Sequence, residues 1–264
     1  MKMEKKQYGK PIGNYITIDI KGLKLAREDE IQKASETLTN ELRTLLEQHI
    51  EKQDEIIILG LGNVYVTPDA LGPKVINEID VTRHLINYLP EYVEEGTRSV
   101  SAIAPGVLGT TGIETVEILK GIVENTHPKL VIVIDALASR SIERISSTVQ
   151  ISDTGIIPGG GVENARSEIS QNTLGIPVIA IGIPTVVETA VLVNDSLDLF
   201  ISKLQKEAKS NDYLNKLKEQ DNYEEIKEAL IPQDYNLIVT PKEIDDLIEN
   251  MKDIVARGIN FAVN

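Results

Sequence analysis

The chain of 264 residues contains no cysteine and no tryptophan, and only two phenylalanines. The absence of cysteine excludes disulfide bonds, a thiolate nucleophile and zinc sites with cysteine ligands. It also fits a reducing compartment. Because aromatic residues make up only 4% of the chain, the core has to consist mainly of isoleucine, leucine, valine and alanine.

Basic residues are few compared with acidic ones. The chain has 27 Lys and Arg against 41 Asp and Glu, which gives a formal net charge of −14. An acidic surface repels phosphate backbones, so we expect no direct binding to nucleic acid. A substrate that associates with DNA would therefore be bound away from the DNA.

Long apolar runs are also missing. No stretch reaches the roughly 20 apolar residues that a membrane span needs. The N-terminal sequence MKMEKKQYGKP is basic and lacks the apolar region of a secretory signal. We therefore expect a cytoplasmic protein with no membrane partner.

Four short apolar runs predict strands that are buried on both faces, because they are apolar throughout and do not alternate. They are Ile56–Leu61, Val100–Ala104, Leu130–Ile134 and Val178–Ile183. Segments with helical spacing of apolar residues lie between them, at 28–50, 73–88 and 113–124. Strands that alternate with helices indicate a single three-layer α/β/α domain, over residues 1–264, with a mainly parallel sheet.

The C-terminal third predicts two further helices. The first covers 184–204 and is followed by a polar excursion near 206–228. Thr240 as N-cap and Pro241 at the first helical position predict the second, near 241–258.

Two aspartates follow predicted strands and are the best candidates for chemistry. Ligands of open α/β sheets usually bind beyond the carboxyl ends of the strands, where we expect Asp69 and Asp135. Two neighbouring carboxyl groups cannot both ionise easily, so one can take a proton from water while the other donates to a carbonyl. The pattern alone favours a helix cap for Asp69. Asp135 ends an apolar run, which is costly unless the group is paired or functional.

Other polar residues allow more than one interpretation. Asp153 lies in the triplet Asp-Thr-Gly of pepsin-like proteases, but those are all-β and need two triplets, so a simple turn is the simpler interpretation. Arg140 could form a surface salt bridge or hold a substrate carboxylate. The glycine-rich segment 158–161 lacks the Lys and Ser/Thr of a phosphate-binding loop, and the three histidines show no metal-ligand spacing. We therefore expect no cofactor and no metal.

Several motifs in this order resemble those of the germination protease family, the endopeptidases that degrade small acid-soluble spore proteins. They are Gly9–Thr17, Gly60–Asn63, Val66–Pro73, Ala104–Gly112, Ile134–Arg140, Gln150–Ile156, Gly175–Gly182 and Thr240–Asp245.

This resemblance implies an α/β fold similar to that of the hydrogenase maturation proteases, and a homotetramer in the spore core. It implies an atypical aspartic peptidase whose catalytic residues match Asp69 and Asp135. Because the family cleaves beside an acidic residue, we assign Arg140 to substrate binding as a hypothesis, together with Asp153.

The resemblance leaves two alternatives open. Asp69 and Asp135 could instead be ligands of a metal-dependent peptidase. Family members usually carry a longer N-terminal region with a propeptide, whereas the matching sequence begins near residue 9 here. The chain could therefore also be a short form that binds spore proteins without cleaving them.

Overall fold

A computed structural model of the chain describes residues 11–20, 27–159, 166–207, 226 and 237–264. The polar excursion predicted near 206–228 therefore lies outside the described residues, apart from 206, 207 and 226.

The described residues form one mixed sheet with the strand order β1-β5-β6-β4-β2-β3, in which β7 pairs with β6. The strands β6, β4, β2 and β3 run parallel, and the others are antiparallel to their neighbours. The mainly parallel sheet is thus confirmed. The strands are β1 Tyr15–Asp19, β2 Ile56–Gly60, β3 Val100–Ile103, β4 Leu130–Ser139, β5 Thr148–Ser152, β6 Val178–Glu188 and β7 Ile238–Val239.

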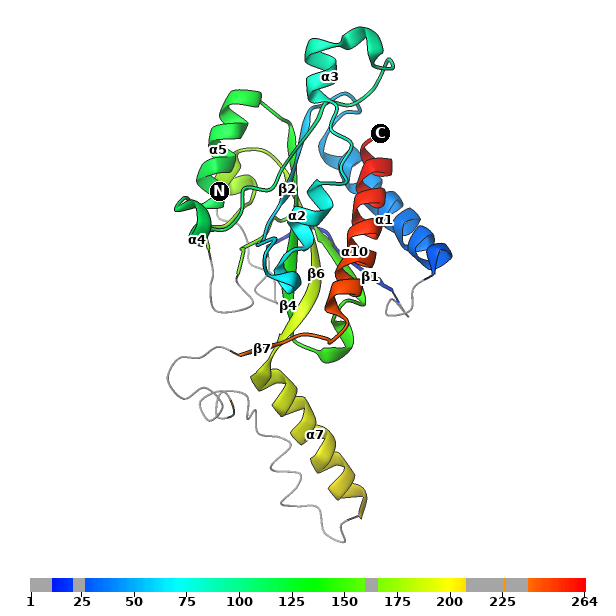
Figure 1. The fold of residues 1–264 in the computed structure, drawn as a ribbon, viewed down its shortest axis with the longest axis vertical. Helices are drawn as coiled ribbons and strands as arrows, with labels where there is room; N and C mark the ends of the chain where they lie inside the picture. The colour runs from blue at the N-terminus through cyan, green and yellow to red at the C-terminus, as the bar shows by residue number, and fades with distance from the viewer. Residues whose placement is uncertain (1–10, 21–26, 160–165, 208–225, 227–236) are drawn as a thin grey trace.

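Helices cover both faces of this sheet, as the three-layer prediction requires (Figure 1). The α-helices are α1 Glu28–His49, α2 Leu71–Ile76, α3 Arg83–Tyr88, α4 Leu108–Thr111, α5 Thr115–Thr126, α6 Gln171–Leu174, α7 Thr189–Glu207 and α10 Ile244–Val263. Helices α1, α2 and α10 pack on one face, and α5 and α6 pack on the other. Short 3₁₀ helices are η2 Thr67–Asp69, η3 Pro90–Tyr92 and η4 Ile142–Arg144.

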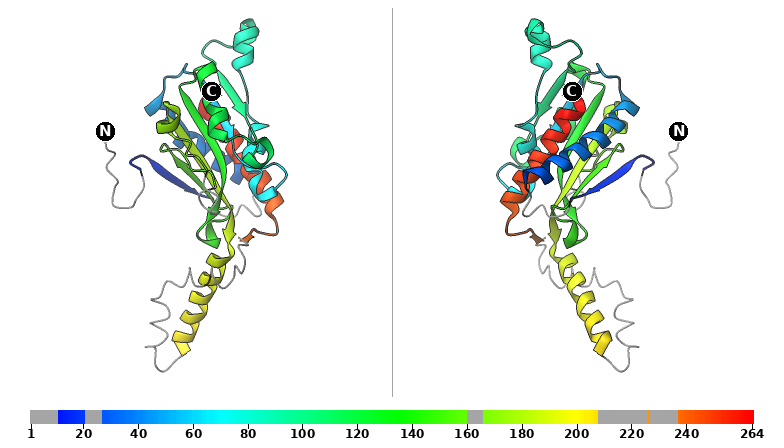
Figure 2. Two further views of the ribbon diagram at one scale, coloured as in Figure 1. Left: turned by 90° about the vertical axis from the view of Figure 1, so that its left-hand side faces the viewer. Right: turned by 90° about the vertical axis from the view of Figure 1, so that its right-hand side faces the viewer.

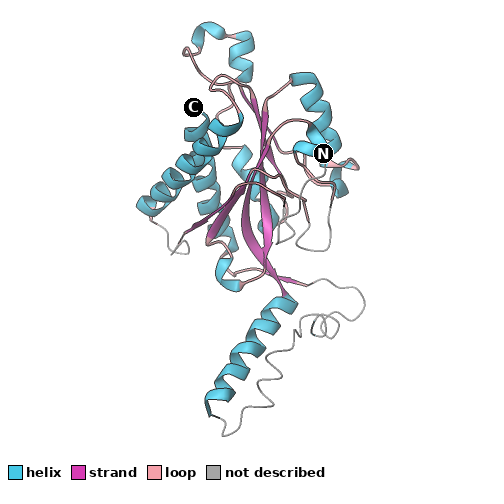
Figure 3. Ribbon diagram, turned by 180° about the vertical axis from the view of Figure 1, so that it is seen from behind, coloured by secondary structure: helices cyan, strands magenta, loops and turns pink. Residues whose placement is uncertain are grey.

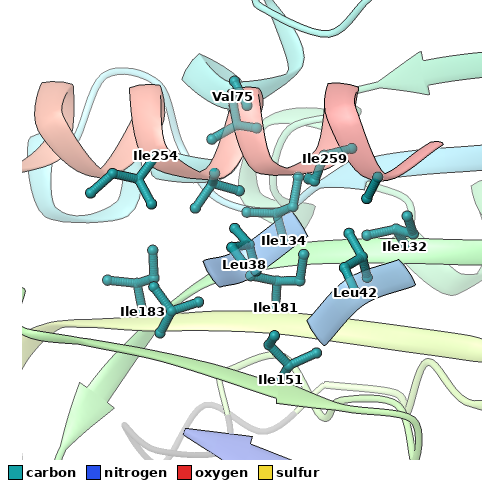
Figure 4. Close-up of a cluster of buried hydrophobic side chains, with 14 of the residues drawn as sticks. Leu38, Leu42, Val75, Ile132, Ile134, Ile151, Ile181, Ile183, Ile254 and Ile259 are labelled. Atoms are coloured by element: carbon teal, nitrogen blue, oxygen red, sulfur yellow. The ribbon is translucent and has the colours of Figure 1, made fainter. Parts of the chain in front are cut away.

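The larger core lies between the sheet and the pair α1 and α10 (Figure 4). Alternate residues of β4 divide between the two cores, because successive strand side chains point to opposite faces. Ile132 and Ile134 enter the larger core, whereas Val131 and Val133 enter the core under α5. Helix α10 approaches α1 closely at Gly258, where an added Cβ would lie 2.6 Å from Leu38 Cδ2.

Four element predictions need correction. Strands β4 and β6 extend beyond their apolar runs, since they pair with each other as far as Ser139 and Val187. The helix predicted over 184–204 therefore begins only at Thr189. The helix predicted over 73–88 is two short helices, α2 and α3. Thr240 does not cap α10, because its hydroxyl donates to the Thr185 carbonyl at 2.9 Å and α10 begins at Ile244.

Helix α7 extends away from the rest of the described chain (Figure 2 and Figure 3). It follows β6 directly, and four of its apolar side chains, Leu197, Leu199, Phe200 and Leu204, are exposed. None of the described helices is both long and apolar enough to cross a membrane.

Candidate active site

A cavity of about 430 Å³ lies where β2 ends and β4 continues. Its wall includes the loop after β2, residues 135–138 of β4, the start of α5 and the segments 106–108 and 157–159. The charged side chains that line it are Asp69, Glu114, Asp135 and Arg166. The cavity therefore lies at the carboxyl side of the parallel strands, where α/β proteins usually bind ligands.

Asp135 is almost fully buried, with only 6% of its surface exposed. It lies within β4 and not at its end, so the sequence prediction misplaced it relative to the strand boundary. Burial raises the pKa of Asp135 to about 8, and the nearby charge of Asp69 adds to the increase, whereas the Ala136 N–H opposes it.

Glycine at position 182 makes room beside Asp135 on the neighbouring strand. Gly182 is the register partner of Asp135 on β6. A Cβ added to Gly182 would lie 2.3 Å from Leu137 Cδ1, so the Leu137 side chain occupies the space that glycine leaves. Leu137 also lines the cavity and lies two residues after Asp135, on the same face of β4. It thus contributes apolar surface next to a buried carboxyl group.

Asp69 is held by the loop that follows β2. The Asn63 N–H donates to Asp69 Oδ2 at 2.8 Å and also approaches the Asp69 carbonyl at 3.1 Å. Gly62 has a φ of 113°, and an added Cβ would lie 2.0 Å from the Asp69 carbonyl oxygen, so only glycine fits there. Asp69 does not cap α2, whose N-cap is Ala70.

The two carboxyl groups differ in their tendency to ionise. Burial raises the pKa of Asp69, and the hydrogen bond from the Asn63 N–H opposes the increase. Asp135 is more buried and also senses the charge of Asp69. Burial and the nearby charge of Asp69 favour the neutral form of Asp135, whereas the Asn63 N–H favours the charged form of Asp69, and the two groups titrate as a coupled pair. An ionised and a protonated carboxyl group at one cavity can together act as general base and general acid.

The structure does not bring Arg140 and Asp153 to this cavity. Arg140 is exposed, directly after the end of β4. Asp153 follows β5, which is antiparallel to β6, so the carboxyl end of β5 lies toward the amino end of β6 and away from the cavity. The two residues predicted to bind substrate thus do not line the site of the aspartate pair.

Asp153 instead joins the residue before β1 to the end of α1. Its carboxylate accepts hydrogen bonds from the Asn14 N–H and the Asn14 amide Nδ2, both at 2.7 Å, and lies 3.3 Å from His49 Nε2. Burial alone would raise the pKa of Asp153, but the bonds from Asn14 and His49 outweigh burial and lower it. This arrangement is a structural contact.

Sequence reasoning missed Glu114 and Arg166, which line the cavity from the start of α5 and from the segment before α6. In the ranges that the structure describes, no acidic side chain forms an ion pair with the Arg166 guanidinium. The only sequence signal for Arg166 is that it follows the glycine-rich segment 158–161 by a few residues. Pro158 and Gly159 of that segment line the cavity. Among the described residues, no group of three or more His, Asp or Glu side chains is placed to hold a metal ion.

Comparison with known proteins gives a consistent result over nearly the whole chain. The family profile described as germination protease matches residues 1–217 and 212–264. The germination protease of Caldanaerobacter subterraneus subsp. tengcongensis is 48% identical over 262 residues, which cover 98% of this chain and 80% of that protein. The germination protease of Clostridium acetobutylicum is 46% identical over 95% of this chain and 78% of its own length. That of Bacillus cereus strain B4264 is 44% identical, over 97% of this chain and 80% of its own length.

Among solved structures, a [NiFe] hydrogenase maturation protease, HycI from Thermococcus kodakarensis KOD1, aligns with a TM-score of 0.33 and 20% identity. The alignment covers 53% of this chain and 80% of that one. A TM-score this low does not establish a shared fold.

Proposed function

Because the chain belongs to the germination protease family, we propose that it is an endopeptidase that starts the degradation of small acid-soluble spore proteins in the spore core during germination. Family membership supports the role of a protease in germination. The observation that supports an aspartic mechanism is that the buried Asp135, whose pKa is raised to about 8, shares one cavity with Asp69.

In the proposed mechanism, Asp69 takes a proton from a water molecule, and the oxygen of that water attacks the carbonyl carbon of the peptide bond. Asp135 donates its proton to the carbonyl oxygen, so the tetrahedral intermediate is a neutral gem-diol. Asp69 then protonates the leaving nitrogen as the C–N bond breaks, and Asp135 recovers a proton from a hydroxyl of the intermediate. Both carboxyl groups return to their starting states.

Replacement of either aspartate by asparagine tests this proposal. Asp69→Asn and Asp135→Asn keep the side-chain shape but remove the base or the acid, so we expect kcat on a recombinant spore protein to fall by about 10² to 10⁴-fold. The exposed Asp80, which does not line the cavity, provides the control Asp80→Asn with unchanged cleavage. Circular dichroism checks that the variants fold.

The same assay separates the alternatives. Normal cleavage by either variant would show that the aspartate pair is not the catalytic group. Loss of wild-type activity in a chelator, with recovery on adding a divalent metal, would support the metal-dependent peptidase. A wild-type chain that binds the spore protein but never cuts it would support the non-cleaving form.

A preference for acidic residues beside the cleaved bond would require a cation at the cavity. Arg166 lines the cavity, whereas Arg140 does not. We expect Arg166→Ala to reduce cleavage beside acidic residues relative to apolar ones, because the guanidinium no longer pairs with the substrate carboxylate. Arg140→Ala is the matched control. Mass spectrometry of the products measures the preference, and the reverse result would return the role to Arg140.

A further inference from the structure

Strand β4 is longer than its neighbour β2, and this leaves part of one edge of β4 unpaired. The last register pair joins Gly60 of β2 to Ile134 of β4, and the Leu61 N–H donates to the Ile134 carbonyl at 2.8 Å. On its other side, β4 stays paired with β6 as far as Ser139. Beyond Ile134, β4 therefore has β6 on one side and no strand of the described chain on the other.

The backbone groups on the unpaired side can be identified by alternation. The N–H and C=O groups of every second residue in a strand point to the same neighbour. Because the Ile134 carbonyl faces β2, the groups of Ala136 and Ala138 face the unpaired side. The bulge in the β4–β6 pair adds its extra residue to β6, so the alternation along β4 continues unbroken.

These edge groups are largely unused within the molecule. The Ala136 N–H is bonded to the Asp135 carboxyl group. No other segment of the described ranges forms a backbone hydrogen bond with the Ala136 carbonyl or with the N–H and carbonyl of Ala138. Ala136, Leu137 and Ala138 all line the cavity of the aspartate pair. An unpaired strand edge is a site where another extended chain can add by main-chain hydrogen bonds.

We propose that the polypeptide substrate binds as an added strand on the free edge of β4 beyond Ile134, in the position that a longer β2 would occupy. This inference rests on the proposed peptidase function and assigns the part of the site that holds the substrate backbone.

The free groups match the pattern of a parallel pair. A substrate residue opposite Leu137 can donate its N–H to the Ala136 carbonyl and accept a bond from the Ala138 N–H. Two residues of extended chain span about 7 Å, so the substrate segment just before this residue lies beside Asp135. In this arrangement the substrate backbone bonds to β4, and the substrate side chains contact the apolar cavity wall formed by Val107, Leu108 and Ile157.

Proline at position 138 tests the inference, because it removes the N–H that faces the free edge and leaves the ladder with β6 in place. Ala102 of β3 provides a matched control on the outer edge of the sheet, two strands away from β4. The Val100 N–H donates to the Thr82 hydroxyl at 2.9 Å, so by alternation the Ala102 N–H also points away from β2. Ala102 does not line the cavity.

Affinity for a recombinant small acid-soluble spore protein is measured in the Asp69→Asn background, and kcat/KM is measured without that substitution. We expect Ala138→Pro to weaken binding by about tenfold or more and to lower kcat/KM by a similar factor, whereas Ala102→Pro changes neither. Equal binding and cleavage by Ala138→Pro and the wild type would overturn the inference while leaving the peptidase proposal intact. If the wild type binds the spore protein without cutting it, the peptidase proposal fails. The affinities of Ala138→Pro and Ala102→Pro then still show whether the spore protein binds at the free edge of β4.

A second measurement covers the case in which Ala138→Pro does not fold. Peptides that span the cleaved bond are N-methylated at one position at a time and assayed with the wild-type enzyme. Strand addition is supported if N-methylation of one residue on one side of the bond prevents cleavage, whereas N-methylation of its immediate neighbour does not. Tolerance of N-methylation at every position would contradict it.

Discussion

The carboxyl groups of Asp69 and Asp135 lie at one cavity, but their surroundings differ. Asp69 accepts a hydrogen bond from the Asn63 N–H, which stabilises its charged form. Asp135 lies within a buried strand, beside Leu137 and near a negative charge, and all of these favour its neutral form. The proposed division of roles between base and acid therefore rests on the position of each residue in the fold.

The raised pKa of Asp135 predicts how the free energy of unfolding depends on pH. A carboxyl group with a higher pKa in the folded state contributes stability that is fully present below its unfolded value of 3.8 and is lost as pH rises through about 8. Asparagine does not ionise. We therefore expect the free energy of unfolding of Asp135→Asn to exceed that of the wild type by an amount that grows from pH 4 to pH 8 and then levels. Urea denaturation across this range measures it, and parallel curves would contradict the burial argument.

Asp153 leads to the opposite pH dependence. Because its pKa is lowered in the folded state, its stabilisation is present above 3.8 and is lost as pH falls through the folded value. We expect Asp153→Ala to lower the free energy of unfolding by about 1–3 kcal/mol at pH 7, because the Asn14 groups lose their acceptor. We expect kcat/KM of the folded enzyme to stay unchanged. A raised KM with normal stability would instead support the substrate-binding role predicted from the sequence.

For individual residues, the sequence predicted the position of the two aspartates at one cavity better than it predicted the other residues that line this cavity. Asp69 and Asp135 each follow a recognisable apolar run, and family motifs cover both. Arg140 was chosen because it is near Asp135 in sequence, but the continuation of β4 places it beyond the cavity. Arg166 and Asp135 line the same cavity but are far apart along the chain. Local sequence patterns do not predict such a long-range arrangement.

Among the elements, the apolar runs predicted where strands begin more reliably than where they end. Beyond Ile134 and Ile183 the two strands β4 and β6 support each other through their ladder, and this pairing is a tertiary property. The strands β1, β5 and β7 were not predicted, because they are short and two of them, β1 and β7, carry partly or largely exposed residues. The unpaired edge beside the cavity follows from these differences in strand length.

Two glycines within helices are predicted to respond in opposite directions to alanine. Gly258 of α10 faces Leu38, and a Cβ there would lie 2.6 Å from the leucine side chain, so we expect Gly258→Ala to destabilise by about 1–3 kcal/mol. Gly121 of α5 is exposed with no atom near an added Cβ, so Gly121→Ala should stabilise by about 0.5–1 kcal/mol. Thermal denaturation distinguishes these signs. A stabilising Gly258→Ala would mean that α1 and α10 can separate without cost.

For the molecule as a whole, α7 is the surface best suited to a second copy of this chain. Leu199 is 67% exposed and Phe200 is 59% exposed on a helix that extends from the body. The acidic Asp195 lies before the middle of α7, and Lys203 lies after it. Two antiparallel α7 helices would therefore bring opposite charges together.

We expect the wild-type chain to form the homotetramer that the family resemblance implies, and Leu199→Ser combined with Phe200→Ser to shift it to smaller species. Light scattering coupled to gel filtration measures the mass. Phe261, which is 55% exposed on α10, provides the control Phe261→Ser. An unchanged mass for the α7 variant would place the contact elsewhere.

The packing of α1 against α10 also has a consequence during synthesis. The face of the sheet that these helices share stays open until α10, which follows every other described element, has left the ribosome. The same helix contacts η2, the turn that holds Asp69. A nascent chain that still lacks α10 therefore has an open core and an unsupported η2 turn, so the proposed active site can form only after α10 has been synthesised.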